Sequence, residues 1–186
     1  NFEQITAIES DPCFKGGDYY QGSRPDTGLA LARRIAHKTF VSLEVLRERA
    51  RNEVVSEKPP YGWYEMKHPV ESYMLYQGQK FVKRFDANTY LRILDAWQWF
   101  DLAGEAGAKD LNELFDRCLG QEFLVFSMDS DLMFHPPEQS KLVHLLKKAR
   151  VPVMWITVHS EKGHDSFLLE PRLFTPHLSQ ALARPA

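Results

Sequence analysis

The chain has 186 residues, 44% of them hydrophobic and 26% charged, and its formal net charge is −2 at pH 7. At about 100–200 residues per domain, this length predicts one domain, or one domain with an insertion. Plentiful aromatic residues and a small net charge exclude a disordered chain, and the scattered Lys and Arg residues argue against a nucleic-acid-binding surface.

Residues 1–119 are predicted to be mainly helical. Residues 11–26 are rich in Gly, Pro and Asp, and 57–69 hold three prolines, so both stretches are expected to be loops. Elsewhere apolar residues recur at the i, i+3, i+4 spacing of a helix face, and Ser42 is the expected N-cap of one helix. The helices are expected at 28–40, 42–50, 70–82, 87–100 and 110–119, the last ended by Gly120 as its C′ residue.

The helix at 87–100 carries an apolar stripe made of Ile93, Trp97 and Phe100. This part of the chain also holds a set of aromatic residues that we expect in its core or in a subunit contact. The set consists of Tyr61, Trp63, Tyr64, Trp97 and Trp99.

Residues 120–186 are predicted to form a β-α-β unit. Short apolar runs near 122–127 and at 151–158 are typical of strands that are covered on both faces. Neither run approaches the ~20 residues of a membrane-spanning helix, so no membrane span is expected. The helices of this part are expected at 137–149, opened by Pro137, and at 172–182. A strand, a helix and a strand with short connections imply parallel strands and a right-handed crossover.

We expect the chain to be a segment of a longer protein. A sheet of two strands is not stable by itself, so further strands are needed. The sequence also starts without Met, inside a helical pattern at 1–8, and without the basic and apolar segments of a secretory signal. The remaining strands are therefore expected upstream of Asn1.

Only two cysteines occur, Cys13 and Cys118, and they are far apart in the sequence. They form neither a disulfide framework nor a metal-ligand spacing. A reducing, cytoplasmic location is therefore expected, with no metal site and no permanently bound cofactor.

Polar segments follow both predicted strands, at the sheet edge where open parallel sheets place their catalytic groups. Asp131 follows the first strand and His164 follows the second. Because neighbouring strands are only about 4.8 Å apart, the Asp131 carboxylate is expected to orient the His164 imidazole, as in a nucleophile–His–acid triad. Asp129 is the alternative acid, and His159 and His135 are the alternative bases.

The nucleophile of such a triad is missing from the sequence. No Gly-x-Ser-x-Gly occurs, and neither cysteine lies at a predicted strand-to-helix turn. The order of acid before His, with the nucleophile earlier in the chain, is that of the α/β-hydrolase fold. Other histidines, such as His37, lack a comparable setting and are expected to be surface residues or structural residues whose hydrogen bonds are satisfied.

Several blocks, in order along nearly the whole chain, resemble the homoserine O-acetyltransferase family. The most specific is Tyr-Gln-Gly at 76–78 followed by Arg-Phe-Asp-Ala-Asn at 84–88. The matching blocks are Gly28–Phe40, Val70–Phe81, Arg84–Leu91, Ser130–Ser140 and Gly163–Leu168.

The resemblance implies the carboxyl-terminal part of an α/β-hydrolase fold, with a helical lid at 1–119 and the end of the core at 120–186. The family transfers an acyl group from acyl-CoA to the hydroxyl of L-homoserine in methionine biosynthesis, by a ping-pong route through a serine. That serine is expected upstream of Asn1, so the 186 residues alone are expected to be inactive. The family also dimerises through its lid, which implies a homodimer.

The family pattern also implies roles for individual residues. His164 would be the general base, oriented by Asp131, and Asp165 would hold the ammonium group of homoserine. Arg33 would pair with the carboxylate of homoserine, although the adjacent Arg34 is the alternative.

Three positions depart from the family pattern. Phe40 stands where the family often has Tyr, Leu132 replaces a common Trp, and His135 is unusual at its position. They leave open homoserine or serine as the acceptor. The donor is left open between acetyl-CoA and succinyl-CoA, because the pocket that selects it is expected to use loops upstream of Asn1. An esterase of the same fold and a truncated chain without catalysis are the further alternatives.

Overall fold

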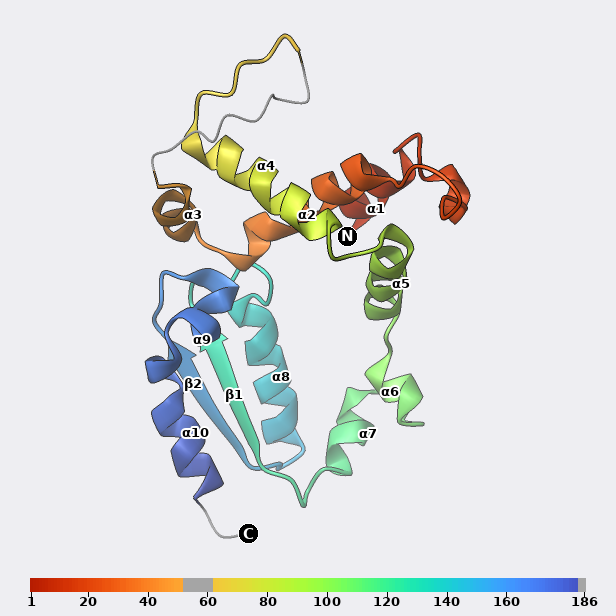
Figure 1. Ribbon diagram of the computed structural model, residues 1–186. Coiled ribbons are helices and arrows are strands. Elements are labelled where there is room, and N and C mark those ends of the chain that lie inside the picture. Colours follow the sequence, from red (N-terminus) through yellow and green to blue (C-terminus); the bar gives the residue numbers. More distant parts are fainter. Residues whose placement is uncertain (52–61, 184–186) are drawn as a thin grey trace. The chain divides into compact units, whose positions relative to one another are not determined.

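The structure is a computed structural model that describes residues 1–51 and 62–183 (Figure 1). The chain divides into two compact units. The first unit comprises Asn1–Lys38 and Leu43–Phe100, and the second comprises Thr39–Ser42 and Asp101–Ala186. Tyr61 and the beginning of the loop expected at 57–69 lie outside the described residues.

The first unit is helical, as predicted, and each helix expected in it is present. Helix α3 begins directly after Ser42, the predicted N-cap position. The helices are α1 (Phe2–Glu9), the 3-10 helix η1 (Lys15–Gly17), α2 (Asp26–Phe40), α3 (Leu43–Ala50), α4 (Pro69–Val82) and α5 (Ala87–Gln98). The last two residues of α2 belong to the second unit.

Two glycines allow helix backbones in the first unit to approach one another closely. A Cβ atom on Gly28 would lie 2.5 Å from the carbonyl oxygen of Ala7, and one on Gly78 would lie 2.9 Å from that of Ala30. Helix α2 therefore crosses α1 and α4 at positions where only glycine fits. One buried core cluster of this unit consists of Ile8, Phe14, Tyr19, Leu29, Ala32, Phe81 and Ala87.

Helix α5 does not pack through its apolar stripe. Its buried residues are Ala87 and Leu94, whereas Ile93 and Trp97 are about half exposed and Phe100, which follows the helix, is 63% exposed. The i, i+3, i+4 spacing describes a possible contact face, but it does not say which face meets a partner.

The second unit contains the predicted β-α-β arrangement, and its two strands are parallel (Figure 1). Their register runs from the pair Phe123 and Val153 to the pair Met128 and Val158. Both strands therefore end at the same edge. The elements are α6 (Leu102–Glu105), α7 (Leu111–Asp116), β1 (Phe123–Met128), α8 (Pro136–Lys148), β2 (Val153–Val158), η2 (Gly163–Asp165), α9 (Ser166–Leu169), η3 (Pro171–Leu173) and α10 (Thr175–Leu182).

Apolar residues cover both faces of this sheet. Alternate strand residues such as Val125 pack with Leu146 of α8 on one face, and Phe126 packs with Phe174 on the other. The cover expected on both faces is therefore present, but the strands are only half-buried over 123–126, and Trp155 is exposed. In the described part of the chain the sheet has two strands, which leaves each strand with an unpaired edge.

Two helix ends differ from the predictions. Helix α7 ends at Asp116, because the N–H groups of Arg117 and Cys118 bond to carbonyl groups three residues earlier and close the last turn. Gly120 therefore lies beyond the cap and is not a C′ residue. Helix α8 begins at Pro136, so Pro137 occupies its second position rather than its first.

Among residues 1–51 and 62–183, no helix is both long and apolar enough to cross a membrane. Nor do three potential metal-ligating side chains converge anywhere in this part of the chain.

Candidate active site

The loops that follow β1 and β2 are tied together by hydrogen bonds at the sheet edge. The Ser130 hydroxyl donates to the carbonyl oxygen of Ser160 (2.5 Å) and accepts from the backbone N–H of Gly163 (3.0 Å). The Ser130 side chain in the first loop is thus hydrogen-bonded to the backbone of the second loop at two residues. The sequence analysis missed this role of Ser130, and its only signal was a small hydroxyl residue between two candidate acids.

Asp131 is fully buried, and its carboxylate is hydrogen-bonded through both oxygens. Oδ1 accepts from the backbone N–H groups of Met133 (2.8 Å) and Phe134 (2.9 Å). Oδ2 lies 2.9 Å from Nδ1 of His164. Buried carboxylates need such partners, since an unpaired one is strongly disfavoured in an apolar interior. The carboxylate is therefore fixed in place before any ligand binds.

The ring of His164 lies among aromatic side chains, and its side chain is 22% exposed. The ring centroids of Phe134, Phe167 and Phe40 lie 5.1, 5.8 and 6.5 Å from that of His164. Because Nδ1 is bonded to Asp131, the second ring nitrogen, Nε2, is the one available for proton transfer. No hydrogen bond to Nε2 is found within the described residues.

The turn that carries His164 requires a glycine at position 163. Gly163 has φ +72°, in the left-handed region that side chains disfavour. A Cβ atom there would also lie 3.0 Å from the backbone nitrogen of Ser42 and 3.2 Å from the carbonyl oxygen of Phe40. The turn therefore packs directly against the segment Thr39–Ser42.

A buried hydroxyl network supports the same loop from its other side. Ser160 donates from Oγ to Glu170 (2.6 Å) and accepts from the N–H of Lys162 (3.1 Å). Ser166, which is fully buried, donates to the carbonyl oxygen of Gly163 (2.5 Å). Sequence reasoning did not find this network, because small polar residues in a loop carry no distinctive spacing.

The alternative acid and one alternative base form a second pair. Oδ2 of Asp129 lies 2.8 Å from Nδ1 of His159, and the hydrogen bond from His159 lowers the pKa of Asp129. The His159 side chain is 83% exposed, however, and Asp129 is 46% exposed. His135, the other alternative, is exposed at the N-cap position of α8 and makes no capping hydrogen bond with its side chain.

Asp165 follows His164 within η2 and is half-buried. Arg33 belongs to the first unit, where its guanidinium carbon lies 5.1 Å from the ring centroid of Phe81. The structure thus places Asp131, His164 and Asp165 together in the second unit, and Arg33 on α2 of the first. The adjacent Arg34 is also half-buried, and its Nε atom has no hydrogen-bond partner.

His37 is the buried histidine of the first unit. Its Nε2 atom lies 3.3 Å from the hydroxyl of Tyr73, and its Nδ1 atom is buried without a partner. Burial, followed by the nearby charges of Arg33 and Arg49, lowers its pKa to about 4. The sequence prediction of a surface or satisfied structural residue is therefore wrong for His37. Periodicity reveals burial, but it does not reveal which groups surround a buried ring.

A His that a buried Asp orients, with Nε2 left accessible, can accept a proton from a hydroxyl group and return it to a leaving group. The geometry of Asp131 and His164 is therefore compatible with the acid and base of a triad.

Comparisons with known proteins show what the chain as a whole is similar to. No protein-family model matches the chain. A homoserine O-acetyltransferase of Methanococcus vannielii is 38% identical over 165 residues, which cover 88% of this chain and 32% of that protein. A homoserine O-succinyltransferase of Magnetococcus marinus is 38% identical over 187 residues, covering 96% of this chain and 46% of that protein.

Solved structures show a similar fold. The crystal structure of homoserine O-acetyltransferase from Bacillus anthracis matches with a TM-score of 0.82 at 23% identity, covering 98% of this chain and 48% of that chain. That of esterase E22 matches with a TM-score of 0.79 at 16% identity, covering 95% and 48%. These similarities define a protein of the α/β-hydrolase fold, as predicted.

Within that fold the sequence matches are specific. The chain belongs to the homoserine O-acetyltransferase family, and it spans about half of the length of these relatives, or less.

Proposed function

We propose that this chain is the lid and carboxyl-terminal part of an enzyme that transfers an acyl group from acyl-CoA to the hydroxyl of L-homoserine, in methionine biosynthesis. One observation carries the proposal. In a chain related to homoserine acyltransferases, the buried carboxylate of Asp131 accepts two backbone N–H bonds and lies 2.9 Å from Nδ1 of His164.

His164 acts as the base in both halves of the proposed reaction. Nε2 first takes the proton of a serine hydroxyl, and the serine oxygen attacks the thioester carbonyl. The carbon–sulfur bond breaks, and the departing thiolate takes the proton from Nε2. In the second half Nε2 takes the proton of the homoserine hydroxyl, which attacks the acyl-serine. The serine oxygen leaves and recovers its proton, so the enzyme ends as it began.

Asp131 keeps the imidazole in the orientation and tautomer that leave Nε2 free to accept a proton. The burial of Asp131 distinguishes it from Asp129. Charge–charge interactions are stronger away from water, and the pair of Asp129 and His159 is largely exposed. Asp131 and His164 are therefore the proposed catalytic pair.

The nucleophilic serine is proposed to lie in a part of the protein outside this chain. The relatives are about twice as long as this chain or longer. The coding sequence upstream of Asn1 is expected to contain a strand followed by Gly-x-Ser-x-Gly. The same segment would supply strands that pair with the open edges of the sheet.

Two side chains are proposed to select a zwitterionic acceptor. Arg33 offers a planar guanidinium that suits the carboxylate of homoserine, and Asp165 offers a carboxylate for its ammonium group. An esterase needs neither, because water is its acceptor. Relatives named as acetyltransferases and as succinyltransferases match equally well, so either acyl group is compatible with the proposal.

We further propose a cytoplasmic homodimer that forms through the lid. Trp63 and Trp99 are 85% and 75% exposed, so they do not belong to the core of the first unit. Exposed large apolar side chains are typical of surfaces that meet another chain. The two cysteines are free thiols, in agreement with a reducing compartment.

An acyl-transfer assay of the protein made from the full coding sequence tests the proposed function. CoA release from acetyl-CoA or succinyl-CoA is measured with and without L-homoserine, and with L-serine as a second acceptor. A homoserine-dependent rate with formation of the O-acyl product is expected. Equal rates of CoA release with and without an acceptor would identify an esterase instead.

A further inference from the structure

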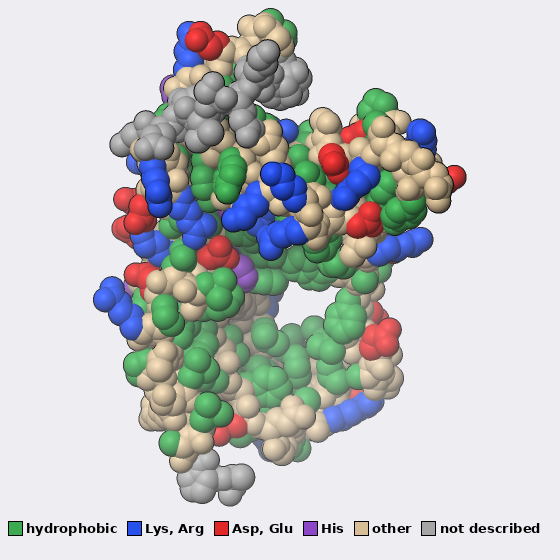
Figure 2. Space-filling model, viewed as in Figure 1, with side chains coloured by type: hydrophobic (Ala, Val, Ile, Leu, Met, Phe, Trp, Pro, Cys, Tyr) green, Lys and Arg blue, Asp and Glu red, His purple; other side chains and the backbone are tan. Residues whose placement is uncertain are grey.

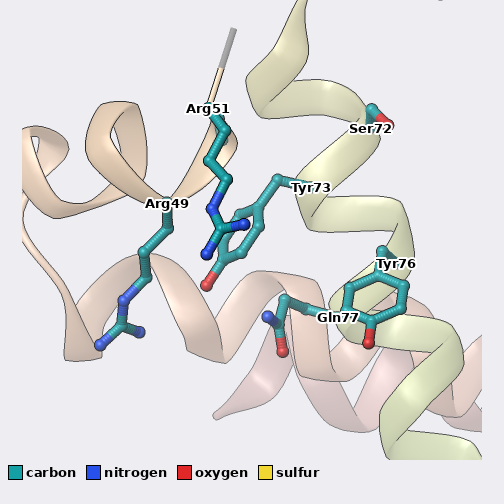
Figure 3. A pocket seen from close by; sticks show the side chains of 7 residues that line it. Arg49, Arg51, Ser72, Tyr73, Tyr76 and Gln77 are labelled. Atoms are coloured by element: carbon teal, nitrogen blue, oxygen red, sulfur yellow. The ribbon is translucent and has the colours of Figure 1, made fainter. Parts of the chain in front are cut away.

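A pocket of about 580 Å³ lies within the first unit, between the end of α3 and the middle of α4 (Figure 3). Its volume is typical of sites for small molecules and exceeds what a single inorganic anion needs. It is lined by Arg49, Ala50, Arg51, Ser72, Tyr73, Tyr76 and Gln77.

The lining is positively charged. Among the described residues that line the pocket, Arg49 and Arg51 carry guanidinium groups, and none carries a carboxylate. Neither arginine forms an ion pair among the described residues. Figure 2 shows Lys and Arg side chains gathered over this part of the first unit. A pocket of this charge favours an anionic ligand.

The polar ends of four side chains point to the same side of the pocket. Figure 3 shows the guanidinium groups of Arg49 and Arg51, the hydroxyl of Tyr73 and the amide of Gln77 turned in one direction. Guanidinium groups bind phosphate oxygens through paired hydrogen bonds, and hydroxyl and amide groups add further donors. The donors are therefore arranged for an oxygen-rich anion.

His37 supports the role of Tyr73 as a donor. Its Nε2 atom lies 3.3 Å from the Tyr73 hydroxyl. A neutral ring with its proton on Nε2 donates to the Tyr73 oxygen, and the O–H of Tyr73 is then free to donate into the pocket. In that tautomer the buried histidine would direct the Tyr73 hydroxyl toward the pocket.

The ring of Tyr76 adds an aromatic wall. It is 48% exposed at the pocket, and exposed aromatic rings stack on nucleobases of any sequence. Guanidinium groups beside an aromatic face suit a nucleotide better than a simple carboxylate or an inorganic ion.

We propose that this pocket binds a phosphate ester, namely the phosphorylated nucleotide end of the acyl-CoA. The identity of the ligand rests on the proposed function, whereas the phosphate-ester chemistry rests on the pocket. Arg49 and Arg51 hold the phosphate groups, Tyr73 and Gln77 complete the donors, and the Tyr76 ring contacts the adenine.

Direct binding measurements on the protein made from the full coding sequence test the proposal. Calorimetric titrations compare CoA, 3′-dephospho-CoA and inorganic phosphate. In the variant Arg49→Gln/Arg51→Gln, CoA binding is expected to weaken by roughly tenfold or more, since hydrogen bonds between charged groups are lost. Arg47→Gln removes an equal charge from an exposed position of α3 outside the pocket and is expected to leave CoA binding unchanged.

Milder variants keep the test decisive if the double variant does not fold. Arg51→Lys retains the charge but loses the paired hydrogen bonds, and Tyr73→Phe removes one donor. Each is expected to weaken CoA binding severalfold. Unchanged CoA affinity in both folded variants would overturn the proposal.

A comparison of CoA with inorganic phosphate distinguishes a site for a phosphate ester from a site for free phosphate. Tighter binding of CoA than of inorganic phosphate, with the difference reduced by Arg49→Gln/Arg51→Gln, supports the proposal. Equal affinity for both would show a site for free phosphate and would overturn the assignment to CoA.

An acyl donor without phosphate groups allows the proposed acyl transfer to be tested independently of the proposed CoA pocket. S-acetyl-N-acetylcysteamine has no phosphate, so Arg49→Gln/Arg51→Gln is expected to lower kcat/KM for the acyl-CoA donor more than kcat/KM for this short thioester. Absence of transfer from every donor would refute the proposed function, while the binding titrations would still decide on the pocket.

Discussion

The two units differ in how they satisfy their buried polar groups. In the second unit, both oxygens of Asp131 are hydrogen-bonded, and Ser130 joins the two loops of the site. In the first unit, Nδ1 of His37 and Nε of Arg34 are buried without partners.

This difference indicates two kinds of binding site. A complete network of buried hydrogen bonds holds a catalytic pair rigidly before the substrate arrives. Buried polar groups without partners are uncommon, and each calls for an explanation such as a missing ligand. We therefore interpret the second unit as a preorganised acid–base site, and the first unit as a charged surface that a ligand completes.

The largest effect is expected from His164→Ala in the protein made from the full coding sequence. Removal of the proposed triad histidine would eliminate the base in both proposed half-reactions, so kcat is expected to fall by roughly 10⁴–10⁶. Single-turnover acyl transfer measures the loss. His159→Ala is the matched control, and it is expected to keep nearly normal activity. If His159→Ala were inactive and His164→Ala active, the exposed pair of Asp129 and His159 would be the catalytic pair.

Asp131→Asn is expected to be the next most severe change. The amide cannot hold the imidazole in the required tautomer, so kcat is expected to fall by roughly 10²–10⁴. The KM for both substrates should change little. Asp129→Asn provides the comparison, and a kcat near that of the parent is expected. A steady-state rate for Asp131→Asn within a factor of two of the parent would contradict the assignment.

Arg33→Gln probes the first unit. Loss of a guanidinium that pairs with a carboxylate is expected to raise the KM for homoserine by roughly 10–100-fold, with a smaller effect on kcat. Arg34→Gln, measured in the same way, distinguishes the two neighbouring arginines. A KM that rises only in Arg34→Gln would transfer the role to that residue.

Gly163→Ala tests the close packing of the turn that carries His164. The positive φ and the short contact with Ser42 together are expected to lower the free energy of unfolding by about 2–3 kcal/mol. Denaturant unfolding measures the change. A matched control is Gly120→Ala, because a Cβ atom there meets no other atom within 4 Å. Equal stability of the two variants would exclude strain at position 163.

The smallest effect is expected from the titration of His37. Its pKa in the folded chain is about 4, below the ordinary value of 6.5. The unfolded chain therefore binds more protons between these values, and stability falls as the pH decreases from 6.5 toward 4. The loss is expected to reach about 2 kcal/mol at pH 5.

His37→Gln should remove this part of the pH dependence, measured by unfolding at pH 5 and pH 7. The exposed His144 offers a control, since His144→Gln is expected to retain the parent's pH dependence. Parallel curves for the parent and His37→Gln would show that His37 does not titrate as described.

Much of the fold was predictable, because it depends on local patterns. The helices of the first unit follow from apolar spacing, and the parallel strands follow from two apolar runs with a helix between them. The end of α7 was not predictable from Gly120, since turn hydrogen bonds close that helix four residues earlier. The packed face of α5 was also not predictable, because it depends on the neighbours of Leu94.

The candidate site likewise has residues that were predictable from the sequence and residues that were not. Asp131 and His164 were predictable as candidates, since both follow strands that end at one edge of the sheet. Asp129 and His159 satisfied the same rule, and burial is what separates the two pairs. Ser130 and Ser160 were not identified, because a hydroxyl that joins two loops has no signature in a single sequence.

The sequence by itself determined the family resemblance, the order of the helices and strands, and the candidate acid and base, all of which depend on residue type and spacing along the chain. Only the tertiary structure decided which acid meets which histidine, which polar atoms stay unpaired, and where the guanidinium groups of Arg49 and Arg51 line a pocket. Those features depend on side chains that are distant in sequence and on their removal from water, and no local pattern records either.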